Sequence, residues 1–449
     1  MTTPEADELV GPTTELLQSL IRNECVNDGT PESGYETRNA DLLQTYLEGA
    51  GLDVARFEKQ EGRASIVARI EGSDPDAASL CLMGHTDVVP VNPEGWSREP
   101  FSGEVLDGEV WGRGAIDMLN ITASMAVAFR RLANEGFQPK GDLIYFGVAD
   151  EEAGGEWGAE FMVNEHWDAV GADYVVTELG GWSQVDGKGD RHIVINVGEK
   201  GIAWTRLRVK GTPAHGSMPF GADNALITAA EIVRRLAEFR PPARLDDIWR
   251  GQVASLDVPD DLRAALLDPS TVWDTIATLP PAAARIAHAC THTTISPNVA
   301  HGGQKTNTIP DSVDLDIDIR LIPGDTIETA RGYLREAIGD LWDRVEITQL
   351  QHAEATRSAT SNALWDTIAT KAQATYPGAR LQPGLIVGGT DARYFREKGS
   401  IAYGAGLYSP DVTFESFGQR FHGNDERIDT ESLGLSAQFW HGLATDLVG

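Results

Sequence analysis

The sequence predicts an α/β protein with a second, inserted α+β domain. Short apolar runs alternate with helical stretches over about residues 1–200, and this style returns from about residue 353. Between them, apolar and polar residues alternate strictly. Short apolar strands separated by helices are typical of a sheet covered on both faces, whereas strict alternation indicates antiparallel strands with one face in water.

The first 200 residues show the helix and strand pattern of the α/β domain. Leu42, Leu43, Tyr46 and Leu47 share one helical face, and Gly51 is the expected C-cap of that helix. A second helix is expected over 122–134. Buried strands are expected at 66–70, 80–84, 143–148 and 174–177.

The alternating segments predict the second domain at about 202–352. Val313, Leu315, Ile317 and Ile319 alternate with charged residues, and 203–209 alternates in the same way. Helical patterns at about 223–238 and 326–339 lie near these strands. The stretch 241–297, rich in Pro, Ala and Asp, is expected to be a mostly helical insertion. Residues 1–201 and 353–449 then form the first domain.

Composition restricts the class of protein. A chain of 449 residues with 41% apolar residues suggests two or three globular domains. With 37 basic and 68 acidic residues, the net charge of −31 argues against nucleic-acid and anionic-membrane partners. The three cysteines are far apart and form no CxxC, which predicts a cytoplasmic protein without a disulfide framework. The sequence shows no signal-peptide pattern and no run of 18 apolar residues, so no membrane span is expected.

Familiar catalytic motifs do not occur in the sequence. It contains neither G-x-S-x-G nor HExxH, and the glycines at Gly112 and Gly114 lack the third glycine of a dinucleotide fingerprint. Acids and histidines instead follow predicted strands. His85 with Asp87 reads either as a metal ligand with its orienting carboxylate or as a simple hydrogen-bonded pair. Asp117, in a Gly-rich turn, reads as a ligand or as a helix N-cap.

Further acids follow the next two predicted strands. Asp150, Glu151 and Glu152 come directly after the strand at 143–148, and Glu178 follows the strand at 174–177. Neighbouring carboxylates raise one another's pKa, and a cation removes this conflict. The alternative is a solvated acidic loop. His422 lies in a further group of polar residues near the C-terminus.

Eight motifs in order carry a resemblance that covers nearly the whole chain: GHTDVVP, WGRGAIDM, DEEAGG, TELGG, GTPAHGSMP, NTIPD, GGTDAR and FHGNDER. The sequence resembles the dinuclear zinc amidohydrolases and metallopeptidases that include aminoacylase, acetylornithine deacetylase, succinyl-diaminopimelate desuccinylase and the glutamate carboxypeptidases. The resemblance implies a zinc-peptidase-like α/β/α catalytic domain with an inserted, ferredoxin-like lid and dimerisation domain.

The resemblance also implies a centre of two Zn²⁺ per subunit, with Co²⁺ and Mn²⁺ as alternatives. The ligands would be His85, Glu178 and Asp117 for one ion, and Glu152, His422 and the same Asp117 for the other. Glu151 would be the general base, and Asp87 would hold the imidazole of His85. Three ligand carboxylates against a charge of +4 leave one further negative charge to be supplied by Glu151 or a hydroxide.

Residues of the second domain and of the GGTDAR motif would bind substrate. The residue matching His215 reaches across a dimer to the oxyanion in this family, and Asn307 and Arg320 resemble residues that hold the substrate carboxylate and carbonyl. Arg320 has an alternative role as a partner of Asp318 or Asp316. Gly389 and Thr390 match a loop that lines the substrate pocket.

The sequence departs from the family pattern in two places. Leu119-Asn120 stands where the family has Lys-Gly after the bridging Asp117, and Gly216 stands where the family often has Ser. Neither position is a ligand.

The expected function is therefore metal-dependent hydrolysis, by a homodimer, of an amide or peptide bond beside a free carboxylate. The substrate would be a small peptide, as for a carboxypeptidase or dipeptidase, or an N-acyl amino acid, as for a deacylase. The long insertion favours the peptidase branch. A catalytically silent binding protein on the same fold is the alternative from another class, and it would be indicated by a missing ligand or base.

Overall fold

A computed structural model describes residues 4–449, which form two compact units. Unit 1 holds the described residues through Val197, together with Ser358–Gly384 and Thr390–Gly449. Unit 2 holds Gly198–Arg357 and Leu385–Gly389. No helix within residues 4–449 combines the length and the apolar character needed to cross a membrane.

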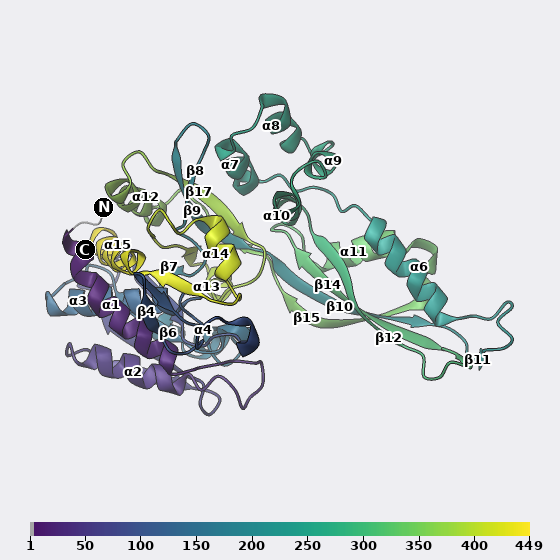
Figure 1. Ribbon diagram of the computed structural model, residues 1–449, viewed down its shortest axis with the longest axis horizontal. Helices are drawn as coiled ribbons and strands as arrows, with labels where there is room; N and C mark the ends of the chain where they lie inside the picture. Colours follow the sequence, from purple (N-terminus) through teal and green to yellow (C-terminus); the bar gives the residue numbers. More distant parts are fainter. Residues whose placement is uncertain (1–3) are drawn as a thin grey trace. The chain divides into compact units, whose positions relative to one another are not determined.

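Unit 1 is built on a mixed sheet whose centre is parallel (Figure 1). The parallel strands, in spatial order, are β6 (Leu143–Val148), β3 (Leu80–His85), β7 (Tyr174–Thr177) and β18 (Ile401–Gly404). The remaining strands of this sheet are β1 (Val54–Glu58), β2 (Ala64–Ile70), β8 (Ser183–Val185), β9 (Arg191–Glu199), β16 (Thr356–Arg357) and β17 (Arg380–Ile386). Of these, β16 and the last residues of β9 and β17 fall within the residue ranges of unit 2. β3 and β6 are buried along their whole length, and β7 and β18 are buried after their first residue, as expected for a sheet covered on both faces.

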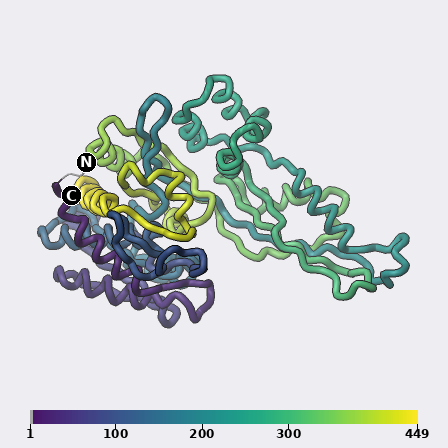
Figure 2. The backbone as a smooth tube through the Cα atoms, in the orientation of Figure 1, coloured from purple at the N-terminus to yellow at the C-terminus, as the bar shows by residue number. Residues whose placement is uncertain are grey.

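Helices cover both faces of this sheet. On one face, Met83 and Phe146 pack against Met162 and Phe395 of two short helices. On the other face, Gly84 lies against Thr122 of a long helix, and the first and last helices pack side by side (purple and yellow in Figure 2). The helices are α1 (Pro4–Arg22), α2 (Thr37–Glu48), α3 (Leu119–Asn134), α4 (Ala159–Glu165), α5 (Trp167–Val170), α12 (Ala363–Thr375), α13 (Ala392–Glu397), α14 (Phe414–Arg420) and α15 (Thr430–Val448).

A small three-stranded sheet brings the C-terminal motif beside a central loop. It consists of β4 (Glu104–Leu106), β5 (Glu109–Trp111) and β19 (Arg427–Asp429). Arg427 pairs with Trp111, and Gly112 N–H donates to the carbonyl of Glu426 (2.9 Å). The segment before β19 is therefore held against the turn that follows β5.

Two local expectations differ from the structure. α2 ends at Glu48 with Gly49 as its C-cap, and Gly51 (φ +78°) lies in the turn beyond it. α3 begins at Leu119, with Met118 as N-cap, so the side chain of Asp117 does not cap this helix. Asp117 is thus left available for other contacts.

Unit 2 contains an antiparallel sheet of ferredoxin-like topology. Its elements follow the order β10 (Gly201–Lys210), α6 (Ala225–Glu238), β12 (Thr294–Gly302), β14 (Ser312–Leu321), α11 (Ile327–Ile338) and β15 (Val345–Ala353). The strand order β12-β14-β10-β15 is that of a split βαβ fold. One face packs against α6 and α11 through apolar side chains.

Shorter elements complete unit 2. Between α6 and β12 lie the helices α7 (Asp247–Ser255), α8 (Asp260–Leu266), α9 (Val272–Ile276) and α10 (Pro281–Thr291), so the segment expected to be a helical insertion is mostly helical. The strands β11 (Ala214–His215) and β13 (Thr308–Ile309) form a separate two-stranded ladder.

Candidate metal centre

Three of the candidate segments meet because they follow parallel strands. His85 ends β3, Glu151 and Glu152 lie in the short 3₁₀ turn after β6 (Glu151–Ala153), and Glu178 follows β7. Parallel strands end at the same edge of a sheet, which is the usual place for a site in such folds. The parallel sheet thus brings three segments that are distant in the chain into one cluster.

Asp117 and His422 join this cluster through the pairing of β5 with β19. His422 Nε2 lies 2.9 Å from Asp117 Oδ2 and 3.3 Å from Glu152 Oε2. His85 Nε2 lies 3.3 Å from Asp117 Oδ1 and 3.7 Å from Glu178 Oε2. The two carboxylate oxygens of Asp117 therefore face two different imidazoles.

Two sets of three side chains are close enough to share a cation. The ligand atoms of His85, Asp117 and Glu152 lie within 4.8 Å of one another, as do those of His85, Glu151 and Glu178. Glu151, expected to be the base, is thus also within reach of a ligand role.

The cluster concentrates negative charge in a buried place. Burial, together with the charge of Asp117, raises the pKa of Glu178 to about 8 and that of Glu152 to about 7. Burial and Glu178 raise the pKa of Glu151 well above its usual value. Burial lowers the pKa of His422, but hydrogen bonds to Asp117 and Glu152 outweigh it and raise the pKa to about 10.

The raised pKa values mean that, without a nearby cation, the carboxylates favour their neutral form and the imidazoles favour their protonated form. A divalent cation would stabilise the deprotonated forms of both. Glu152 Oε1 is also buried without a hydrogen-bond partner, which is costly for a carboxylate oxygen. Imidazole nitrogens and carboxylate oxygens are the donors that zinc takes in catalytic sites, so the residues present fit a metal.

Asp87 is fully buried behind His85. Its Oδ2 accepts from Asn27 Nδ2 (2.8 Å) and from Glu152 N–H (3.1 Å). His85 Nδ1 lies 3.0 Å from the Asp87 carbonyl and 3.5 Å from Asp87 Oδ1. With Nδ1 directed at Asp87, Nε2 is the nitrogen that faces the cluster, which is the usual arrangement behind a metal-binding histidine.

His215 and Asn307 are neighbours in unit 2. His215 pairs with Thr308 across β11 and β13, and Gly216 N–H donates to the carbonyl of Asn307 (2.8 Å). Ser217 N–H donates to Nδ1 of the exposed His215 (3.2 Å). Because a backbone N–H only donates, Nδ1 is the acceptor, and the proton of the neutral ring lies on Nε2.

Arg320 lies at the other end of β14. Its Nε donates to Asp318 Oδ1 (2.8 Å), and its guanidinium lies 5.3 Å from the centroid of the Trp204 ring. Arg320 is eight positions after Ser312 on β14, which at about 3.3 Å per position is roughly 26 Å. One chain therefore does not bring Arg320 together with Asn307. Gly389 belongs to unit 2, and the fully buried Thr390 belongs to unit 1.

Several buried polar residues escaped prediction from the sequence. Glu426 accepts N–H groups at the Asp117 turn, and its position inside FHGNDER was the one available signal. Asp150 was grouped with Glu151 and Glu152 in the sequence, but the structure turns it away from the cluster towards Arg63 (2.6 Å). Glu36 and Arg63 lie in no motif. Asp391, in GGTDAR, is buried, and burial raises its pKa to about 7.

The fold and the cluster define a metal-binding α/β enzyme. Residues 81–446 match the family described as Peptidase family M20/M25/M40. The chain is 29% identical over 392 residues to the N-fatty-acyl-amino acid synthase/hydrolase PM20D1 of Xenopus tropicalis, across 84% of this chain and 74% of that protein. It is 29% identical over 443 residues to the succinyl-diaminopimelate desuccinylase of Gluconacetobacter diazotrophicus, across 98% and 97% of the two chains.

Solved structures agree on the fold. The M20 family metallo-carboxypeptidase Sso-CP2 of Sulfolobus solfataricus matches with a TM-score of 0.70 at 19% identity, and the match covers 99% of each chain. The chain belongs to peptidase family M20/M25/M40. The predicted family and fold class are confirmed, and the protein is a metal-dependent hydrolase of amide bonds.

Proposed function

We propose that the enzyme hydrolyses an amide bond beside a free carboxylate, and that its cluster would hold two Zn²⁺ ions with Asp117 serving both ligand sets. The observation that carries this proposal is the position of Asp117, whose Oδ1 and Oδ2 face His85 and His422 separately (3.3 and 2.9 Å). A carboxylate between two imidazoles suits a bridging ligand. Glu178 completes the set on the His85 side, and Glu152 completes the set on the His422 side.

Glu151 is assigned as the general base. It lies next to Glu152 at the cluster, and its raised pKa favours uptake of a proton. Two divalent ions would polarise the amide carbonyl and make hydroxide available near neutral pH. Glu151 takes the proton of the attacking water and passes it to the leaving amine, while Asp87 keeps His85 in the tautomer that presents Nε2.

His215, Asn307 and Arg320 are assigned to the substrate. The Nε2–H of His215 is a donor for the developing oxyanion, and the guanidinium of Arg320 suits a carboxylate. Because Asn307 lies with His215 and roughly 26 Å of strand separates this end of β14 from Arg320, we assign the two groups to different subunits of a homodimer. The exposed apolar side chains Met218 and Phe220, close to His215 in sequence, support such an interface.

Mixing inactive subunits tests the homodimer. His215→Ala and Glu151→Gln subunits should regenerate activity in heterodimers, because one of the two sites then has both groups intact. Absence of recovery after demonstrated subunit exchange would place His215 in its own chain's site or outside catalysis.

The substrate is a small peptide or an N-acyl amino acid, because both present the same amide and carboxylate. The named relatives include a fatty-acyl-amino acid hydrolase and a desuccinylase, whereas the helical insertion supports the peptidase assignment. Gly389 and Thr390 are assigned to the wall of the substrate pocket. The buried thiols of Cys25, Cys81 and Cys290 suit a reducing compartment, and we assign the enzyme to the cytoplasm.

Metal removal tests the proposal. Chelation should abolish hydrolysis of a panel of dipeptides and N-acyl amino acids, and added Zn²⁺ should restore it, with Co²⁺ or Mn²⁺ as alternatives. Elemental analysis should give two ions per chain. Full activity in exhaustively demetallated protein would refute the proposal, and a metal-loaded protein inactive on the whole panel would favour the silent binding protein.

A further inference from the structure

Two buried arginines of unit 1 each bind a buried glutamate. The side chain of Arg63 is fully buried, and its Nε donates to Glu36 Oε2 (2.6 Å). The side chain of Arg113 is 3% exposed, and its Nη1 donates to Glu426 Oε2 (2.6 Å). None of these four side chains belongs to the proposed ligand sets.

Each glutamate uses its second oxygen to hold a backbone N–H of a turn at the metal centre. Glu36 Oε1 accepts from Asp150 N–H (3.1 Å). Glu426 Oε1 accepts from Ile116 N–H (2.7 Å) and from Asp117 N–H (3.0 Å). The first turn carries Glu152 and the second carries Asp117, so each arginine–glutamate pair is attached to one carboxylate of the cluster through the main chain.

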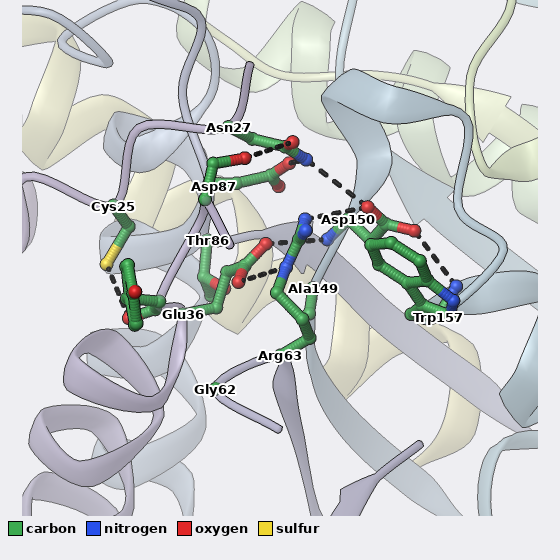
Figure 3. A network of polar contacts seen from close by, with 12 residues as sticks. Cys25, Asn27, Glu36, Gly62, Arg63, Thr86, Asp87, Ala149, Asp150 and Trp157 are labelled. Carbon is green, nitrogen blue, oxygen red and sulfur yellow. Dashed lines mark hydrogen bonds and ion pairs between the residues drawn. The ribbon is translucent and has the colours of Figure 1, made fainter. Parts of the chain in front are cut away.

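The turn at Asp150 depends on such support. Asp150 has φ +70°, a left-handed conformation that residues with a side chain rarely adopt. Figure 3 shows its carboxylate between Arg63, Asn27 and Trp157. Oδ1 accepts from Arg63 Nη2 (2.6 Å) and Asn27 Nδ2 (3.3 Å), and Oδ2 accepts from Trp157 N–H (2.9 Å). This conformation turns the next two residues, Glu151 and Glu152, away from the line of β6.

Asn27 connects the turn at Asp150 to Asp87, which lies behind His85 in the metal centre. Asn27 Nδ2 donates to Asp150 Oδ1 and to Asp87 Oδ2, and Asp87 Oδ2 also accepts from Glu152 N–H. A tryptophan ring lies close to each guanidinium, with Trp157 5.1 Å from Arg63 and Trp96 5.4 Å from Arg113. Because this region excludes water, the hydrogen bonds of Asn27, Asp87 and the two arginines are stronger than the same bonds at the surface.

We propose that Arg63–Glu36 and Arg113–Glu426 are positioning pairs, which set Glu152 and Asp117 in their metal-binding geometry before an ion arrives. The inference rests on the proposed function, because it assigns both carboxylates to the metal centre. Prepositioned ligands avoid the cost of ordering the turns during binding. Partners behind metal ligands typically change metal affinity by about 10–100-fold.

The experiment measures Zn²⁺ affinity, by competition with a chromophoric chelator, together with the visible spectrum of the Co²⁺-loaded protein. Arg63→Met and Arg113→Met should each weaken Zn²⁺ binding by about 10–100-fold and change the Co²⁺ bands, because a ligand carboxylate has moved. Arg63→Lys should recover only part of the affinity, since a single ammonium does not reproduce the fork that joins Glu36 to Asp150.

Arg396→Met is the matched control. Arg396 is also a buried arginine of unit 1, and among its contacts Nε and Nη2 donate to the carbonyl of Ala402 (3.0 and 2.9 Å). This variant should lower the melting temperature while Zn²⁺ affinity and the Co²⁺ spectrum stay as in the wild type.

Wild-type Zn²⁺ affinity and an unchanged Co²⁺ spectrum in Arg63→Met would overturn the inference, because the pair would then serve the fold alone. If Arg63→Met does not fold, Glu36→Gln decides, since it keeps the shape and removes the charge. Weaker binding in that variant supports the inference, and unchanged binding overturns it. A wild-type protein that binds no metal would refute the proposed function before any variant is made, and the inference with it.

Discussion

Ion pairs of the same chemistry lie in opposite environments in the two units. In unit 1, Arg63–Glu36 and Arg113–Glu426 have side chains no more than 3% exposed. In unit 2, Arg206 and Arg208 form two-pronged hydrogen bonds with the aspartates opposite them on β14, and their side chains are 37% and 54% exposed. Charge pairing is therefore used in both units, but these two pairs of unit 1 lie out of water, whereas the two pairs on β10 and β14 lie in contact with it.

The difference lies in what each pair determines. Arg206 and Arg208 are the cross-strand partners of Asp316 and Asp314, so the register of β10 and β14 has already brought the charges together. The buried pairs of unit 1 instead join segments far apart in the chain and hold turns that no regular element fixes. Breaking a buried pair leaves an uncompensated charge and costs about 3–5 kcal/mol, whereas solvent screens an exposed pair.

The largest expected effect separates two neighbours inside the buried cluster. Glu151→Gln removes the base and leaves the proposed ligands, so kcat should fall by about 10²–10⁴-fold with both metal ions retained. Glu152→Gln should instead cost one ion. Steady-state kinetics together with elemental analysis of both variants measures this. Loss of metal in Glu151→Gln, with both ions kept in Glu152→Gln, would reverse the two roles.

The sequence predicted the regular elements of unit 1 well where local pattern determines them. The strands at 143–148 and 174–177 have the predicted bounds, because each is a mostly apolar run that begins after an aspartate and ends one or two residues before an acidic residue. The ends of the helices were predicted less accurately. Gly51 was expected as a C-cap, yet α2 already ends at Glu48, since two glycines close together offer alternative ends.

The cluster was predictable for a different reason. Each of its acids and histidines follows a strand or belongs to a motif, and a parallel sheet brings strand ends together. Glu36 and Arg63 left no such trace, and the motifs that contain Arg113 and Glu426 do not show that these two residues meet, because the members of the two pairs are 27 and 313 residues apart. Periodicity reports local structure, so a contact at such separation appears only once the chain is folded.

The next effect concerns Lys200, a buried cation of unit 2 whose hydrogen-bond acceptors are neutral. Its Nζ donates to the His292 carbonyl (2.8 Å) and to Thr294 Oγ1 (3.4 Å). Burial lowers the pKa of Lys200 from 10.5 to about 7. The unfolded chain therefore binds more protons than the folded chain between about pH 7 and 10, so the free energy of unfolding should rise with pH, by up to about 1.4 kcal/mol per unit.

Lys200→Met isolates this contribution. Urea unfolding of the wild type and of Lys200→Met at several pH values between 7 and 10 should show a stability difference that changes with pH, because only the wild type carries the titrating amine. A difference that stays constant over this range would show that Lys200 is solvated and charged in the folded protein, and would weaken the contrast with the paired charges of unit 1.

Arg320 lies between the two environments, since its side chain is 24% exposed and pairs with Asp318. If it holds the substrate carboxylate, Arg320→Ala should reduce kcat/KM by about 10–150-fold, the value of a charge-assisted hydrogen bond. The loss should be much smaller for the same substrates as amides. Asp318→Asn is the matched control, because it removes the internal partner and keeps Arg320. Equal losses on acids and amides would mean that Arg320 serves the sheet.

The smallest effect is expected at the exposed pair Arg206–Asp316. Water screens this pair, and the register of β10 and β14 persists without it, so Arg206→Ala should change the melting temperature by no more than about 2 °C. Asp316→Ala and the double variant complete a cycle whose coupling should be small and should shrink further in high salt. Thermal unfolding at low and high ionic strength measures it. A large coupling that persists in salt would show that this pair also specifies structure, and the contrast between the two units would then rest on the metal centre alone.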